Sequence, residues 1–429
     1  MSIPPYSGAA RTPRRFDPQA RLTRWFFGRF FALLLVAISV AEAGLLWWLT
    51  SALEVVPFAV YLLAPVALYM LNSRVAANGR QRHRARLGAL PRVYHAIALG
   101  SLFCFAFLVV DATLWLAAKL VLGAIPADAT TVGRVASLGS GIDAAFRWLA
   151  NAGIATIALS FVYGYSIGQL RLKVRRVRLP LANAPAAWHG LTIAQISDIH
   201  VGQNLDPQQL QRFVARVNEL QPDIVCITGD IADSPHADMD TFFPILAGLR
   251  ARHAVFAILG NHDHYANPDR VVEALQRHTS FTVLRDASTT LDLHGHRLSV
   301  IGLDDRGRDW ARGVLELPYL HRALSEADGA SAVLLLCHRP DLFPYAARSG
   351  VDLMLSGHTH GGQIAMPWLK GRTRNLAQFV TRFDRGLFEL DGKYLYVNCG
   401  LGVTGQRIRL CTPREITLIE LSAGAAAGA

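Results

Sequence analysis

The hydrophobic pattern divides the chain into two halves of different character. In the first half, four apolar stretches are each long enough to cross the ~30 Å hydrocarbon core of a bilayer, which takes about 20 helical residues. They cover approximately residues 25–49, 55–71, 94–122 and 146–170. The sequence therefore predicts four transmembrane helices within residues 25–170. The alternative, helices buried inside a large soluble protein, is disfavoured because all four stretches reach this length.

From about residue 181 the pattern changes to short apolar runs that alternate with amphipathic helical segments. Residues 206–220 and 239–250 have the spacing of helices. Runs typical of buried strands occupy residues 191–197, 223–228, 254–259, 331–337, 351–356, 394–398 and 415–421. Strands that are apolar throughout indicate sheets covered on both faces, so an α/β layered domain is predicted over residues 186–421.

Charge is distributed unevenly between the two halves. Residues 1–180 carry 20 Lys and Arg against 6 Asp and Glu, which is +14, whereas residues 181–429 carry 23 against 26, which is −3. The positive charge lies in clusters that precede the first span, separate the second from the third, and follow the fourth. With four crossings all three clusters fall on one side of the membrane, and the positive-inside rule makes that side cytoplasmic.

These patterns predict an integral protein of a bacterial-type inner membrane, with the α/β domain on the cytoplasmic side. We expect a basic cytoplasmic segment at 1–24, a basic linker at 171–185 and a disordered tail at 422–429. As an alternative, Arg14–Arg15 and the apolar run ending at Ala41–Ala43 form a cleaved signal peptide. The three remaining spans would then still deliver the α/β domain to the cytoplasm.

Polar side chains directly follow five of the predicted strands. They are Asp198 and His200, then Asp230, then Asn261, His262 and Asp263, then His338 and Arg339, and finally His358 and His360. Such residues converge at the carboxyl ends of strands, where α/β folds bind ligands. Carboxylate, imidazole and amide ligands without sulfur suit Mn²⁺, Fe or Zn²⁺, and their number is enough for two ions that share one carboxylate.

The order of these motifs, D-x-H, G-D, G-N-H-D, a strand-end His and G-H-x-H, resembles that of the calcineurin-like metallophosphoesterases. The resemblance extends over about residues 186–421. The longer motif GHTHGGQ, together with four preceding spans, is most similar to the membrane-associated YkuE/YaeI-type branch of that superfamily. The resemblance implies a layered αββα sandwich of two mixed sheets flanked by helices. It also implies two divalent metal ions, among which we expect Mn²⁺ in preference to Fe or Zn²⁺.

The resemblance also implies a role for each motif residue. The family pattern assigns one ion to Asp198, His200, Asp230 and His360, and the other to Asp230, Asn261, His338 and His358. His262 matches the catalytic histidine that contacts phosphate and protonates the leaving oxygen, and Asp263 is a candidate for orienting its ring. Arg339 is a candidate for phosphate binding, with an ion-paired arginine as the alternative.

The sequence thus predicts a membrane-anchored phosphoesterase in which a hydroxide between two metal ions attacks a phosphodiester or pyrophosphate. A lipid-linked phosphate ester and the bilayer itself are the expected partners. A phosphomonoesterase or protein phosphatase remains an alternative, as does a transport or sensory protein with a regulatory domain, which Asp111 inside the third span favours. Nucleic acid is not an expected partner, because the −3 charge of the α/β half offers no broad phosphate-binding surface.

Overall fold

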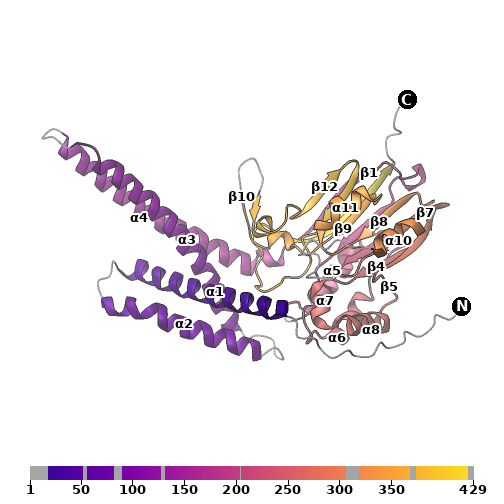
Figure 1. The fold of residues 1–429 in the computed structure, drawn as a ribbon, viewed down its shortest axis with the longest axis horizontal. Helices are drawn as coiled ribbons and strands as arrows, with labels where there is room; N and C mark the ends of the chain where they lie inside the picture. The colour runs from indigo at the N-terminus through magenta and orange to yellow at the C-terminus, as the bar shows by residue number, and fades with distance from the viewer. Residues whose placement is uncertain are drawn as a thin grey trace. The chain divides into compact units, whose positions relative to one another are not determined.

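The protein is described by a computed structural model (Figure 1). The structure describes residues 18–51, 56–81, 89–126, 131–202, 204–305, 318–327, 329–367 and 373–423. The chain divides into two compact units. The helical unit comprises residues 1–81 and 93–155, and the α/β unit comprises residues 82–92 and 156–429.

Four long helices account for the N-terminal part of the chain. They are α1 (Pro18–Thr50), α2 (Phe58–Gln81), α3 (Ala89–Gly123) and α4 (Val132–Ser166). Four segments are long and apolar enough to cross a membrane: Ala32–Thr50, Phe58–Ala76, Val93–Gly123 and Val132–Leu170, the last of which extends beyond the end of α4. Large apolar side chains on all four helices are exposed, as expected for helices whose solvent is lipid. The predicted four apolar helices are therefore confirmed.

Small residues let three of these helices approach one another within the helical unit. A Cβ atom on Gly44 of α1 would lie 2.3 Å from the ring of Phe105 on α3, and one on Gly153 of α4 would lie 2.1 Å from Phe107. Trp48 Nε1 of α1 also donates a hydrogen bond to Asn151 Oδ1 of α4, at 2.9 Å. Interfaces between helices in lipid are enriched in small residues, which allow such tight packing.

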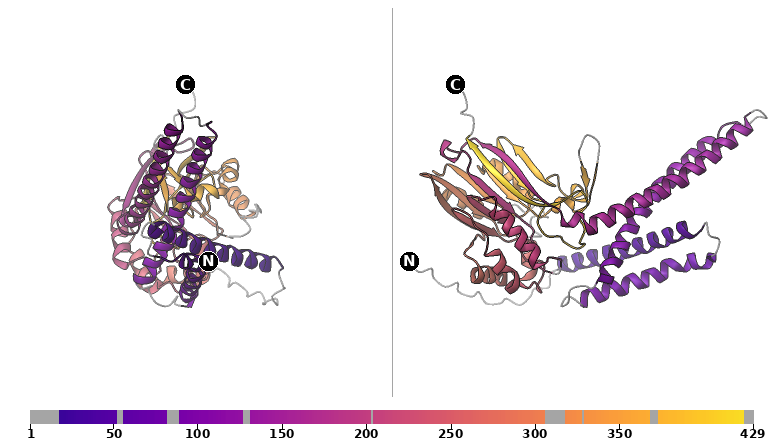
Figure 2. Two further views of the ribbon diagram at one scale, coloured as in Figure 1. Left: turned by 90° about the vertical axis from the view of Figure 1, so that its left-hand side faces the viewer. Right: turned by 180° about the vertical axis from the view of Figure 1, so that it is seen from behind.

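Two six-stranded mixed sheets form the α/β unit (Figure 2). The first has the order β1-β14-β2-β3-β4-β5. Its strands are β1 (Leu172–Leu181), β14 (Arg414–Ala423), β2 (Thr192–Ile196), β3 (Ile224–Thr228), β4 (Ala254–Ile258) and β5 (Thr282–Val283). The second has the order β12-β13-β9-β8-β7-β6. Its strands are β12 (Gly386–Leu390), β13 (Lys393–Val397), β9 (Leu353–Ser356), β8 (Ala332–Leu336), β7 (His296–Gly302) and β6 (Ala287–Leu293).

Three layers of apolar side chains hold this unit together. Between the two sheets, Ile193 and Phe256 of the first sheet belong to the same core as Val300 and Leu334 of the second. On its other face, the first sheet is covered by α5 (Pro207–Asn218), α6 (Met239–Leu246) and α8 (Pro268–His278). The second sheet is covered by α10 (Pro318–Glu326) and α11 (Phe343–Arg348). The predicted sandwich of two mixed sheets flanked by helices is confirmed.

The segment expected to be a basic linker, residues 171–185, instead contains an edge strand. β1 pairs in parallel with β14, from Leu172 opposite Arg414 to Leu181 opposite Ala423. The strand forms because Val174 and Val177 pack against the cores on opposite faces of the sheet, while the basic residues between them remain exposed. Of the expected tail, 422–423 belong to β14 and 424–429 lie outside the described residues, as do 1–17 of the expected N-terminal segment.

Candidate metal centre

The polar residues that follow the strands come together at the carboxyl ends of both sheets. Asp198 and His200 follow β2, and Asp230 follows β3. Asn261 begins the short helix α7 (Asn261–Ala266) after β4, while His338 follows β8, and His358 and His360 follow β9. Three groups of side chains have potential metal-ligand atoms within 4.8 Å of one another: Asp198, His200 and His360; Asp230, His338 and His358; and His200, Asp233 and His262.

The backbone of this region adopts conformations that ordinary residues rarely take. The φ angles of Asp198, His200, Asp230, His358 and His360 are all positive, between 48° and 72°. Left-handed conformations are uncommon outside glycine, and their clustering at one place is typical of a functional site. These turns aim side chains from separate loops at the same point.

Two glycines are required for this close approach. A Cβ atom on Gly260 would lie 2.3 Å from Asp230 Oδ1, and one on Gly357 would lie 1.9 Å from Ser197 Oγ. Both distances are well inside van der Waals contact. Any side chain at either position would therefore displace the loops that carry the polar residues.

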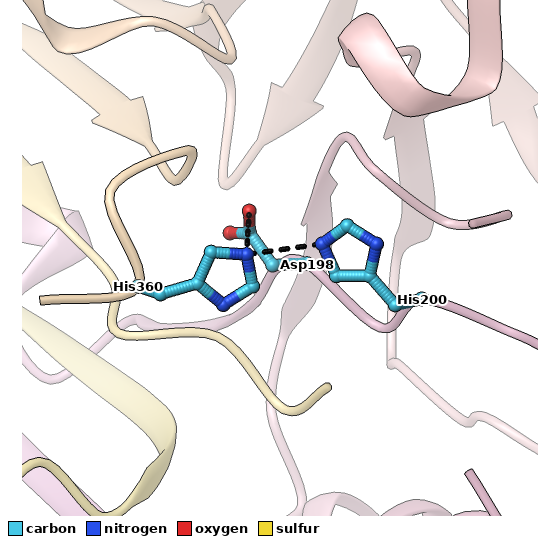
Figure 3. A group of neighbouring side chains, drawn as sticks. All are labelled: Asp198, His200 and His360. Atoms are coloured by element: carbon cyan, nitrogen blue, oxygen red, sulfur yellow. Dashed lines mark hydrogen bonds and ion pairs between the residues drawn. The ribbon is translucent and has the colours of Figure 1, made fainter. Parts of the chain in front are cut away.

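Figure 3 shows how the first group converges. The Nε2 atom of His360 lies 3.0 Å from Nε2 of His200 and 3.4 Å from Oδ1 of Asp198. All three side chains are buried. A carboxylate and two imidazole nitrogens that point at one another away from water are suited to share a cation, because each can offer a lone pair to it.

The second group is centred on Asp230, whose Oδ2 lies 3.2 Å from Nε2 of His338. The other ring nitrogen of His338, Nδ1, is 2.8 Å from the carbonyl oxygen of Thr228. Because a carbonyl only accepts, Nδ1 carries the hydrogen, and in the neutral ring Nε2 then turns a lone pair toward the carboxylate. This arrangement is stable only with a proton or a cation between the two groups.

Asn261 supplies a third observation that fits a metal ion. Its Oδ1 atom is buried and makes no hydrogen bond with any residue that the structure describes. A buried amide oxygen without a partner is costly, and a cation removes that cost. Asp230 lies between the two groups, since its Oδ2 is also 3.7 Å from Nε2 of His200. The residues present therefore fit two ions with a shared carboxylate.

The titration of these groups reflects the excess of negative charge. Burial alone would lower the pKa of His338, but the carboxylate of Asp230 raises it to about 10. In turn, His338 holds the pKa of Asp230 well below its usual range despite burial, whereas burial raises the pKa of Asp198. Positive charge is thus favoured between Asp230 and His338.

His262 stands at the edge of this cluster and is partly exposed. Its backbone N–H donates to Asp230 Oδ1 at 2.8 Å. The ring Nδ1 lies 3.1 Å from the carbonyl oxygen and 3.3 Å from the Oδ1 of Asp233. Burial opposes protonation, but these contacts with Asp233 raise the pKa of His262 to about 9. Nδ1 therefore holds a hydrogen, and Nε2 is free to face a ligand.

Asp263 does not orient the ring of His262 as the sequence led us to expect. Its carboxylate accepts hydrogen bonds from the backbone N–H groups of Ile231, Ala232 and Gly260, at 3.1, 2.7 and 2.9 Å. The reason is its position in the first turn of α7, from which an acidic side chain folds back onto the preceding backbone. Burial and the charge of Asp230 raise the pKa of Asp263 to about 6.

Asp233 takes the orienting position instead, and sequence reasoning missed it. Its Oδ1 also lies 3.2 Å from Nδ1 of His200, so one carboxylate contacts the outer nitrogens of two rings. The available signal was its position three residues after Asp230, in the same loop after β3. Nothing in composition distinguishes it from any other loop aspartate.

Arg339 is an ion-paired arginine, which was the alternative to phosphate binding. Its Nε lies 2.9 and 3.1 Å from the two carboxylate oxygens of buried Asp305. Its Nη1 lies 3.1 Å from Nε2 of His358. The guanidinium therefore positions a histidine of the second group while a buried carboxylate balances its charge.

Comparison with known proteins agrees with this geometry. Residues 191–362 match the calcineurin-like phosphoesterase family. The chain is 32% identical over 240 residues to the metallophosphoesterase YkuE of Bacillus subtilis. The aligned residues cover 55% of this chain and 81% of that protein. It is 31% identical over 286 residues to a transmembrane protein with a metallophosphoesterase domain of Danio rerio, covering 64% of this chain and 63% of that protein.

The chain belongs to the calcineurin-like metallophosphoesterases. It is a metal-dependent phosphohydrolase by family, and its four apolar helices together with the zebrafish relative indicate membrane association. A further relative is the UDP-2,3-diacylglucosamine pyrophosphatase LpxG of Chlamydia trachomatis, 26% identical over 320 residues, which cover 62% of this chain and 94% of that protein.

Proposed function

We propose that this protein hydrolyses a phosphodiester or pyrophosphate bond in a lipid-linked substrate, at a centre of two divalent ions on the cytoplasmic side of the membrane. The convergence of two buried ligand groups on Asp230 carries this proposal. One ion would be held by Asp198, His200, Asp230 and His360, and the other by Asp230, Asn261, His338 and His358. When bound, divalent ions neutralise charge on the phosphate and lower the pKa of a coordinated water toward ~7.

His262 is the residue that we assign to proton transfer. The contact between its Nδ1 and Asp233 leaves Nε2 for the transfer of a proton to the leaving oxygen. Asp233 is a positioning residue, because it contacts the rings of His200 and His262 and reaches the phosphate only through them. Arg339 likewise acts through His358.

The nature of the substrate is supported by two observations of different kind. Four helices are long and apolar enough to hold the chain at a bilayer, and the chlamydial relative is named as a pyrophosphatase of a diacylated, UDP-linked sugar. Manganese is the ion we expect in preference to Fe or Zn²⁺, all of which suit a donor set of nitrogen and oxygen without sulfur. The basic clusters beside the spans support the cytoplasmic position of the α/β unit.

The test is a hydrolysis panel on the purified full-length chain loaded with Mn²⁺. The panel contains a UDP-linked diacyl lipid, a soluble phosphodiester and a soluble phosphomonoester, and metal content is measured on the same sample. We expect two ions per chain and the highest kcat/KM on the lipid pyrophosphate. Two bound ions without hydrolysis of any ester would contradict the proposal, and preference for the monoester would favour the phosphomonoesterase alternative.

A further inference from the structure

An exposed apolar surface lies beside the metal centre. Within the described part of the α/β unit that follows Leu170, six large apolar side chains are exposed, and four of them fall between residues 366 and 380. They are Met366 on β10 (Ala365–Pro367) and Leu376, Phe379 and Val380 on or next to the 3₁₀ helix η7 (Leu376–Phe379). Phe379 and Val380 are each 88% exposed. Such a concentration marks an interaction surface.

This surface is joined to the end of the membrane-spanning helix α4 by a short strand-like segment. Leu410 exchanges backbone hydrogen bonds with Gln363 and Ala365, both at 2.9 Å, at the start of β10. On the other side, the backbone N–H of Arg409 donates to the carbonyl of Gly164 on α4, at 3.2 Å. The base of β10 is therefore fixed close to the point at which α4 ends.

The end of α4 is itself apolar on its outside. Leu159, Val162, Ile167 and Leu170 are all more than half exposed, so the surface that suits lipid continues to the last residue of the span. A bilayer that surrounds this helix must therefore reach the neighbourhood of β10. Phe379 and Val380, on the segment that follows β11 (Thr373–Asn375), are then positioned to meet its surface.

A basic cavity of about 430 Å³ adjoins the same segment. Its lining includes Arg175 and Arg176 of β1, a strand that begins two residues after the span Val132–Leu170. It also includes Thr373 and Arg385, which lie before and after the apolar residues 376–380. Glu415 is the acidic residue in the lining, and it lies 3.8 Å from Arg175. The arginines in the lining outnumber its one carboxylate, which favours an anion.

We propose that this face of the α/β unit docks on the bilayer that holds α4. The cavity binds the phosphate head group of an anionic lipid, and Met366, Phe379 and Val380 enter the adjacent acyl boundary. Apolar anchors beside arginines are the combination that binds anionic membrane surfaces. Docking does not depend on catalysis and can be tested without it.

Docking has a consequence for the substrate, which rests on the proposed function. Thr359, between His358 and His360, donates its hydroxyl to the carbonyl of Asp384 at 2.6 Å. Asp384 also accepts from Asn375 Nδ2 at 2.6 Å, so the apolar segment and the metal-binding loop are held together. The metal centre is thus kept at a fixed height above the bilayer, where the phosphates of a lipid-linked substrate lie.

The depth of Phe379 tests the apolar part of the proposal. In full-length chain with Cys411→Ser, a nitroxide on Phe379→Cys is compared with one on Ser325→Cys, an exposed position of α10. In phosphatidylglycerol-containing nanodiscs we expect at least a fivefold higher ratio of oxygen to nickel-chelate accessibility at 379. Equal ratios at the two positions would overturn the proposal. So would loss of access to both reagents at 379, since that indicates a protein partner.

The head-group cavity is tested by lipid titration of the full-length chain in neutral detergent, followed by thermal unfolding. Dioleoylphosphatidylglycerol should raise the unfolding temperature at lower concentration than dioleoylphosphatidylcholine. Arg175→Gln with Arg385→Gln should raise the half-saturating concentration at least fivefold. Arg277→Gln, an exposed arginine of α8, is the matched control and should leave it unchanged. Equal responses to the two lipids, or an equal loss in the control, would overturn the proposal whether or not the chain hydrolyses phosphate esters.

Discussion

The two units of this protein place polar and apolar groups in opposite ways. In the helical unit, large apolar side chains such as Leu62 and Leu120 are about two-thirds exposed, at 64% and 67%. In the α/β unit, carboxylates such as Asp198 and Asp230 are almost completely buried, at 0% and 2%. Each arrangement is unfavourable in water by itself. The first is stable in lipid, and the second is stable with a bound cation, so each unit shows which environment or ligand it requires.

Removal of the shared carboxylate should produce the largest effect on the α/β unit. Asp230→Ala leaves the two ligand groups without their common member, so we expect metal binding to fall below two ions per chain and hydrolysis to fall to background. The measurements are metal content by mass spectrometry and steady-state rates. Asp292→Ala, an acidic residue of the exposed β6–β7 hairpin, is the control. Retention of two ions with normal turnover would show that Asp230 is not shared.

Removal of the proton donor should affect the rate without affecting the metal. His262→Ala should lower kcat by roughly 10²–10⁴-fold, the usual contribution of general acid catalysis, while both ions stay bound. The physical reason is that His262 Nδ1 is engaged by Asp233 and the ring is not among the assigned metal ligands. The loss should be smaller for substrates whose leaving group needs no protonation. An equal loss for good and poor leaving groups would argue against proton transfer by this residue.

A lysine introduced at an exposed position should have different effects in the two units. Val110 lies near the middle of the span on α3 and is exposed, and Thr290 is an exposed position on β6 of the α/β unit. Val110→Lys should disfavour membrane insertion by about 2.5–3.5 kcal/mol. Thr290→Lys should change stability by no more than about 0.5 kcal/mol, because its environment is water. The readout is the fraction of chain that remains in the membrane after alkaline extraction, and equal behaviour would contradict a lipid environment for α3.

The smallest effects should distinguish the two aspartates near His262. Asp233→Asn should lower kcat by about 10–100-fold, as expected when a residue that orients a ligand or catalytic ring is lost, with little change in unfolding temperature. Asp263→Asn should instead lower the unfolding temperature and leave kcat nearly unchanged. An amide there turns a donor toward buried backbone N–H groups and should cost about 1–3 kcal/mol of stability. The pair is measured by steady-state kinetics and thermal unfolding, and a kinetic effect at Asp263 alone would restore the role expected from sequence.

Much of the site could be predicted because its motifs are local. The residues Asp198, His200, Asp230, Asn261, His338, His358 and His360 directly follow strands, and parallel strands bring their carboxyl ends together whatever the loops do. The expectation for Asp263 was wrong for a local reason too. Adjacency in sequence to His262 suggested contact, but the start of α7 directs the two side chains differently.

The sequence by itself determined the surroundings expected for each unit, lipid for the helices and water for the α/β unit. The length of an apolar run and the spacing of its apolar residues depend only on residues that are neighbours in the chain. Tertiary structure decided which charges meet. Asp233 reaches His262 across a turn, Arg339 is neutralised by Asp305, and the basic segment after the fourth span becomes β1 because β14, more than 200 residues later, is there to pair with it. Such contacts depend on the direction in which each loop leaves its strand, and that direction is set by packing across the whole unit.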